Sequence, residues 1–265
     1  MKLDILLPTN LSEIPLSRYQ EFIAMKEKSN DEEFIAQKMI QIFCGMKLGE
    51  VAKIKMKHLN ELIAHFTKVF SEKPQLIRKF KIKDIEFGFI PKFDDISFGE
   101  YVDLENYMKD WKTYHKALSV MYRPIKNTNK DKYEIVDYEP NEDMQDLMKF
   151  APLDVAISSS FFLSSLGIEL LKATQTYLKK ELKKMTDSTN LAKDTNLAKT
   201  GVGMEVSMDW LTETLQSLMR SQATDLLNVS RILPSKSKNT KSKPEKLNNR
   251  IVQTCTVFVI IFVPA

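Results

Sequence analysis

Apolar residues recur at three- and four-residue steps over residues 15–70, and this spacing predicts three helices. The first begins at Pro15, because proline is favoured in a first helical turn. The second is predicted to be capped by Asn30, with Glu33 completing a capping box. The third begins at about Met56 and carries one apolar stripe, which predicts a buried face. The residues of that stripe are Leu59, Leu62, Ile63, Phe66, Val69 and Phe70.

The pattern changes to alternation over residues 78–90, where apolar side chains flank Lys83 and Asp84 at every second position. This period predicts a small β-hairpin with a two-residue turn. Residues 127–132 are predicted to form a polar turn, and residues 133–138 a short strand. The predicted fold is therefore mainly α with a small β-hairpin, in a helical bundle-like body over residues 1–186.

One further helix is predicted over residues 100–121 and is ended by Pro124, because the residue before a proline disfavours helical geometry. Its apolar face is aromatic and includes Tyr107, Trp111 and Tyr114. Such a face binds a partner where it is exposed and fills the core where it is not.

The longest helix is predicted over residues 152–185, and its first half is uncharged and rich in serine. A membrane span needs about 20 apolar residues. Asp154 and Glu169 enclose a shorter run, so we expect no span but a buried helix that packs through small residues. Phe161 and Phe162 on this helix are further candidates for partner binding.

The C-terminal part is predicted to contain a linker at residues 187–206, helices at 207–233 and a basic, disordered tail at 234–265. The formal net charge of the chain is +4. Residues 235–250 hold six basic residues and one glutamate, so they contribute +5 and the remainder is near −1. A body this close to neutral lacks a broad basic face for phosphate, and a nucleic-acid partner is not expected.

Cysteine usage and the N-terminus indicate a reducing compartment. Cys44 and Cys255 lie far apart, which does not suggest a disulfide framework. The short apolar run at the N-terminus contains Asp4, is broken at Pro8 and has no small-residue cleavage pattern. We therefore expect a cytoplasmic protein.

Residues with catalytic or metal-binding chemistry are sparse. His58 and His65 are seven positions apart on one predicted helix, whereas helical metal sites favour a spacing of four. Paired carboxylates such as Asp94 and Asp95 have no diagnostic spacing, and loop solvation accounts for them. Phosphate-loop, dinucleotide, nucleophile-elbow and CxxC motifs are missing from the sequence. We expect no enzymatic activity, no metal and no cofactor.

Residues 87–125 read FGFIPKFDDISFGEYVDLENYMKDWKTYHKALSVMYRPI. This stretch resembles tailed-bacteriophage structural or assembly proteins that are similar to tail assembly chaperones. The resemblance extends from about Leu6 to Leu178, and the basic C-terminal end departs from it. It implies a mainly helical protein of the host cytoplasm that holds an aggregation-prone tail component until assembly.

The expected partners are therefore other phage structural proteins, with self-association as a further possibility. The candidate partner-binding residues are Tyr107, Trp111, Tyr114, Phe161 and Phe162. Two alternatives remain open at this point. One is a virion structural component, such as a head or tail completion protein. The other is a nucleic-acid-binding regulator that acts through the basic tail.

Overall fold

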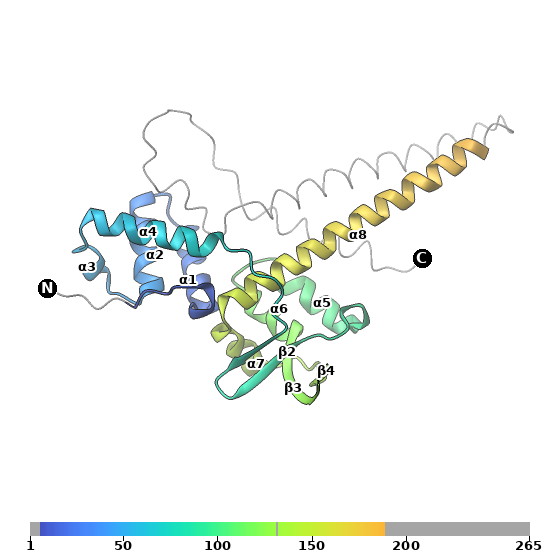
Figure 1. The fold of residues 1–265 in the computed structure, drawn as a ribbon, viewed down its shortest axis with the longest axis horizontal. Helices are drawn as coiled ribbons and strands as arrows, with labels where there is room; N and C mark the ends of the chain where they lie inside the picture. The colour runs from blue at the N-terminus through green and yellow to red at the C-terminus, as the bar shows by residue number, and fades with distance from the viewer. Residues whose placement is uncertain (1–5, 131, 189–265) are drawn as a thin grey trace. The chain divides into compact units, whose positions relative to one another are not determined.

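The computed structural model describes residues 6–130 and 132–188, and these residues confirm the mainly α fold class with a small β component (Figure 1). They divide into two compact units, the first ending at Phe161 and the second beginning at Phe162. Most of the predicted linker, the C-terminal helices at 207–233 and the basic tail lie outside the described residues.

The strands come in two pairs along the sequence, and α5 and α6 lie between the second strand and the third. The α-helices are α1 (Leu16–Lys26), α2 (Glu32–Cys44), α3 (Leu48–Val51), α4 (Met56–Ser71), α5 (Phe98–Tyr107), α6 (Tyr114–Met121), α7 (Glu142–Leu147) and α8 (Leu153–Ser188). The 3-10 turns are η1 (Leu11–Glu13), η2 (Phe93–Asp95) and η3 (Met148–Phe150). The strands are β1 (Lys79–Ile82), β2 (Ile85–Phe89), β3 (Tyr122–Asn129) and β4 (Lys132–Ile135).

The three helices predicted before residue 72 are present as α1, α2 and α4, but the cap of α2 was wrongly placed at Asn30. Asp31 is the cap, and its Oδ1 accepts hydrogen bonds from the backbone of Glu33 at 3.0 Å and Phe34 at 3.1 Å. One carboxylate oxygen thus satisfies two amides that have no partner inside the helix. Gly45 ends α2 with φ +64°, a conformation that glycine adopts without strain.

Aromatic side chains form the core between α1, α2 and α4. Phe43 lies at its centre, with ring centroids 5.3 Å from Phe22, 5.5 Å from Phe66 and 5.2 Å from Phe70. Phe22, Phe43 and Phe66 have no exposed surface. The stripe predicted on α4 is therefore a core face, as its helical spacing indicated.

The predicted hairpin is present as β1 and β2, and two more strands extend it into one antiparallel sheet of four strands in the order β1-β2-β3-β4. The helix predicted to stop before Pro124 does end at Met121, and Pro124 itself lies inside β3, where it pairs with Phe87. The predicted turn at residues 127–132 is shorter than expected, since β3 continues to Asn129.

Tyr133 connects β4 to β2 across the intervening strand. Its hydroxyl donates a hydrogen bond to the carbonyl oxygen of Phe89 at 2.7 Å. Its ring lies against Gly88, where an added Cβ atom would be 2.4 Å from the ring. Gly88 is therefore required by the close approach of this ring.

The helix predicted over residues 100–121 is two helices, α5 and α6, separated by a turn. Thr113 Oγ1 donates to the carbonyl oxygen of Tyr107 at 2.8 Å, and Asp110 Oδ1 accepts from the backbone of Lys112 at 3.0 Å. Such local side-chain bonds compete with the helical backbone ladder. The aromatic period runs through the turn, which is why the sequence suggested one helix. A shorter helix, α7, was missed in the acidic stretch after Pro140.

The part of α8 in the first unit packs through buried small residues, as predicted. Ser158 and Ser159 are 1% and 0% exposed. The hydroxyls of Tyr114 and Ser159 lie 3.2 Å apart, and Ser158 Oγ accepts a hydrogen bond from the backbone of Ile77. Small side chains here let the helix approach its neighbours closely.

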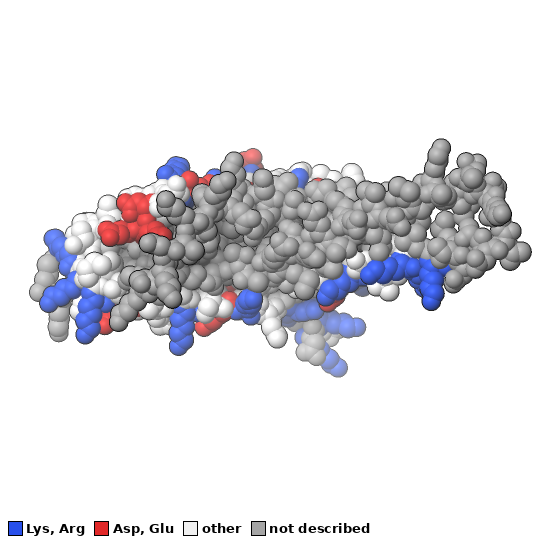
Figure 2. All heavy atoms as spheres, turned by 90° about the horizontal axis from the view of Figure 1, so that it is seen from above, with Lys and Arg blue, Asp and Glu red and all other residues white. Residues whose placement is uncertain are grey.

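The part of α8 in the second unit changes from apolar to charged along its length. Leu163, Ile168 and Leu171 are buried, whereas Lys179 and Lys180 are exposed. Basic side chains gather along this charged half of the helix (Figure 2). Within the described residues, Leu153–Lys180 is long and apolar enough to cross a membrane by length and composition. Core helices of soluble proteins meet the same criteria, so length and composition do not establish a span.

Gln20 joins α1 to the start of α6. Its Nε2 donates to the carbonyl oxygen of Trp111 at 2.7 Å and lies 3.0 Å from His115 Nδ1. His115 is 6% exposed. Burial lowers the pKa of His115 to about 4, and the nearby charges of Lys149 and Lys116 act in the same direction. A neutral imidazole that accepts at Nδ1 fits this geometry.

Phe66→Ala is expected to lower the free energy of unfolding by about 3–5 kcal/mol, because it removes a fully buried ring and leaves a cavity. Urea denaturation measures the loss. Met56→Ala on the same helix is the control, since Met56 is 65% exposed and its truncation should change stability by less than about 0.5 kcal/mol. A loss below about 1 kcal/mol for Phe66→Ala would contradict the buried assignment.

His115 should make stability depend on pH. The unfolded chain takes up a proton near the usual pKa of 6.5, whereas the folded chain does so only near 4. The free energy of unfolding that neutral His115 contributes is therefore fully present above pH 6.5, the pKa in the unfolded chain. It is lost as the pH falls from 6.5 to 4. Urea denaturation at several pH values should show that the free energy of unfolding falls more steeply with decreasing pH for the parent chain than for His115→Gln.

His58 supplies the control for the pH experiment, because its side chain is 59% exposed on α4. His58→Gln should follow the pH profile of the parent chain. Parallel profiles for the parent chain and His115→Gln would show that His115 is protonated equally in the folded and unfolded states.

Candidate protein-binding site at the start of α5

Phe98 is the most exposed aromatic side chain in the described ranges, with 82% of its surface accessible. It is the first residue of α5. Burying a phenylalanine side chain stabilises a structure by about 1.5–3 kcal/mol. In the described structure Phe98 stays exposed, so its ring does not add this stabilisation to the fold. A complex in which a partner covers the ring would be stabilised by it.

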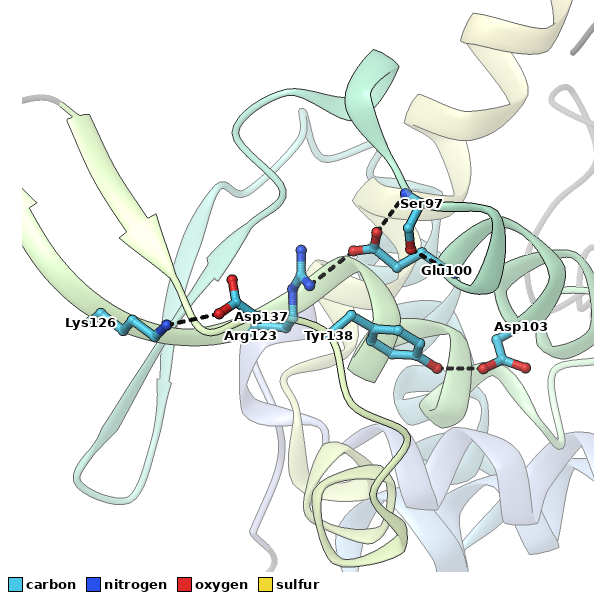
Figure 3. Close-up of polar contacts among 7 residues, drawn as sticks. All are labelled: Ser97, Glu100, Asp103, Arg123, Lys126, Asp137 and Tyr138. Carbon is cyan, nitrogen blue, oxygen red and sulfur yellow. Dashed lines mark hydrogen bonds and ion pairs between the residues drawn. The ribbon is translucent and has the colours of Figure 1, made fainter.

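A capping box holds the turn that carries Phe98 (Figure 3). Ser97 Oγ accepts a hydrogen bond from the backbone of Glu100 at 3.3 Å. In return, the backbone of Ser97 donates to Glu100 Oε2 at 2.7 Å. Two amides at the helix start are thereby satisfied, and the backbone on both sides of Phe98 is fixed.

Glu100 also anchors this turn to the sheet. Its Oε1 lies 2.9 Å from an Nη atom of Arg123 on β3, and the two side chains are 8% and 12% exposed (Figure 3). Both carboxylate oxygens of Glu100 are thus engaged. Buried charges are tolerated when they are paired in this way, and removal of one partner leaves the other uncompensated.

A second group of contacts supports the same arginine from the segment after β4. The Tyr138 hydroxyl donates to Asp103 Oδ2 at 2.6 Å, and the Tyr138 ring centroid is 6.0 Å from Arg123 Cζ (Figure 3). Burial raises the pKa of Tyr138 above its usual range, and the hydrogen bond to Asp103 adds to this. Tyr138 therefore stays a protonated donor, and α5 is held from two sides.

Arg123 retains one unsatisfied donor. Its Nε atom is buried and has no hydrogen-bond partner in the part of the chain that the structure describes. A buried donor without a partner costs about 1–3 kcal/mol. The Glu100–Arg123 pair therefore fixes the orientation of α5 on the sheet more than it adds to net stability.

The structure separates the five residues predicted to bind a partner. Trp111 and Tyr114 come together, with ring centroids 4.7 Å apart, and Tyr114 is a core residue at 3% exposure. Tyr107 is partly exposed, and Lys116 Nζ lies 5.6 Å from its ring centroid. Phe161 is partly exposed at the end of the first unit, and Phe162 is partly exposed at the start of the second.

Phe98 was not among the predicted site residues, although the sequence contains a signal for it. The stretch Ser97-Phe98-Gly99-Glu100 has the spacing of a capping box, which would have placed the helix start at Ser97. Phe98 would then stand at the first helical position. The aromatic stripe that begins later in the sequence drew attention to residues that lie deeper in the fold.

The two histidines considered for metal binding have different partners. His58 Nδ1 lies 3.1 Å from Glu61 Oε2, and His65 Nε2 lies 2.7 Å from the carbonyl oxygen of Pro8. Among the described residues, no group of three or more His, Cys, Asp or Glu side chains is placed to hold a metal ion.

Comparisons with protein families, with characterised proteins and with solved structures find no match to this chain. The candidate site therefore stands on its own geometry.

Arg123→Met is expected to lower the free energy of unfolding by about 3–5 kcal/mol, because it leaves the Glu100 carboxylate buried without its counter-ion. The double variant Glu100→Leu with Arg123→Met should recover much of this loss, since neither charge remains. Urea denaturation of both variants measures the coupling.

Lys126→Met serves as the control, because the Lys126–Asp137 pair is exposed and should contribute less than about 1 kcal/mol. A double variant no more stable than Arg123→Met would mean that the loss comes from packing of the arginine side chain and not from an unpaired charge.

Proposed function

We propose that this chain is a non-enzymatic protein-binding factor of tailed-phage assembly, which holds a phage structural protein in the host cytoplasm until it is incorporated. The observation that carries the proposal is the exposure of Phe98, 82%, on a turn that buried contacts hold in place. The assignment to phage assembly rests on the resemblance of residues 87–125 to tail assembly chaperones.

Rigid presentation of an aromatic ring favours binding on energetic grounds. Association has to offset the ordering of side chains and loops at the interface, which costs about 0.5–1.5 kcal/mol for each side chain immobilised. The capping box and the Glu100–Arg123 pair order this turn before a partner arrives. Burial of the Phe98 ring by a partner then contributes to the binding free energy with little ordering cost to offset, as at interface hot spots.

The test is co-expression of the chain with a panel of tail proteins from tailed phages. The parent chain should keep one of these proteins soluble and co-purify with it. Phe98→Ala should reduce the co-purified amount by about tenfold, the effect of removing a hot-spot ring. Its free energy of unfolding should equal that of the parent chain, because the ring contributes little to the core.

Phe150→Ala is the matched control, since Phe150 is also an exposed phenylalanine of the first unit, at 63%. Equal co-purification by Phe98→Ala and the parent chain would reject the proposal. Mass spectrometry of purified particles separates the two assembly roles, because a chaperone-like factor is absent from mature particles and a completion protein is retained.

A further inference from the structure

The surface beside Phe98 is acidic. Residues 92–110 contain six carboxylate side chains and two lysines, and five of the six carboxylates, all but the buried Glu100, are exposed or partly exposed. Asp94 and Asp95 are exposed on η2, and neither forms an ion pair within residues 6–130 and 132–188. Within this part of the chain their charges are not neutralised by a basic side chain.

The two aspartates are held at a set place relative to Phe98. The Phe93 ring next to them stacks on the buried ring of Phe89, with centroids 5.9 Å apart and an interplanar angle of 12°. Asp95 precedes Phe98 by three positions, so their Cα atoms are separated by at most about 11 Å. A single short segment of a partner could contact both residues.

Phe98 continues into a small apolar face along α5. Helical spacing places Tyr101 and Val102 beside it, and both are partly exposed. The face thus combines an aromatic ring, further apolar surface and two carboxylates that have no ion-pair partner in the described part of the chain. Lysine and arginine side chains match this combination, because their apolar stems cover a ring while their charged groups meet carboxylates.

We infer that the Phe98 face takes a positively charged segment of another protein, with an apolar or arginine side chain over Phe98 and basic groups at Asp94 and Asp95. The inference rests on the proposed function and names the chemistry of the partner. Charge complementarity of this kind speeds encounter and excludes acidic partners by repulsion.

The probe is a short fluorescent peptide in which lysine and leucine alternate, and its control is the same peptide with glutamate in place of lysine. Fluorescence anisotropy with the full chain measures both. The lysine peptide should bind, and the glutamate peptide should not. The double variant Asp94→Asn with Asp95→Asn should weaken binding of the lysine peptide by about threefold to tenfold and reduce its salt dependence.

The matched control is the double variant Asp84→Asn with Glu86→Gln, which removes two exposed carboxylates from the β1–β2 hairpin instead. It should bind the lysine peptide like the parent chain. Equal binding of both peptides, or equal weakening by the two double variants, would overturn the inference. Self-association abolished by the Asp94 and Asp95 changes would do so too, because the occupant would then be a second copy.

The co-expression experiment separates this inference from the proposed function. If Phe98→Ala loses the tail protein but the Asp94 and Asp95 variant keeps it at every salt concentration, the partner is not a basic segment and the proposed function stands. If Phe98→Ala keeps the tail protein, the proposed function itself fails.

Discussion

The buried pair between Glu100 and Arg123 is the contact on which the arrangement around the candidate site depends. It joins the first turn of α5 to β3, over an interval of the chain that contains all of α6. Charges are buried at a cost that only paired and hydrogen-bonded geometry offsets. Glu100 meets that condition by binding Arg123 with one oxygen and the backbone of Ser97 with the other. The start of α5, and with it the exposed position of Phe98, follows from this geometry.

Buried tyrosine hydroxyls connect the remaining elements of the first unit. Tyr122 donates to the carbonyl oxygen of Ile77 at 2.7 Å, Tyr133 donates to that of Phe89, and Tyr114 contacts Ser159 on α8. Burial raises the pKa of Tyr114 and Tyr122 above the usual range, so these hydroxyls remain protonated. Each tyrosine thus contributes apolar area and also satisfies a polar group that would otherwise be buried alone.

In the first unit, the residues that stabilise the fold differ from the residue that we propose binds a partner. The aromatic rings on α1, α2 and α4 are packed against one another, and Tyr19 on α1 also contacts Trp111 in the turn before α6, whereas Phe98 stands outside that packing at 82% exposure. A residue that adds little to the core can be changed without unfolding the chain. The proposed binding role of Phe98 is therefore open to direct mutational tests, which is not true of Tyr114.

Local periodicity was sufficient to predict α1, α2, α4, α8 and the β1–β2 hairpin, because these elements form from neighbouring residues with one apolar face. It also placed the buried stripe that contains Phe66. Periodicity shows which residues share a face, but it does not show what covers that face. The division of the aromatic helix at Asp110 rests on local side-chain hydrogen bonds that an apolar period does not reveal. The pairing of β3 with β2 and the burial of Tyr114 beside an exposed Phe98 were decided by the tertiary structure. Each depends on contacts between residues far apart in the chain, as between Glu100 and Arg123.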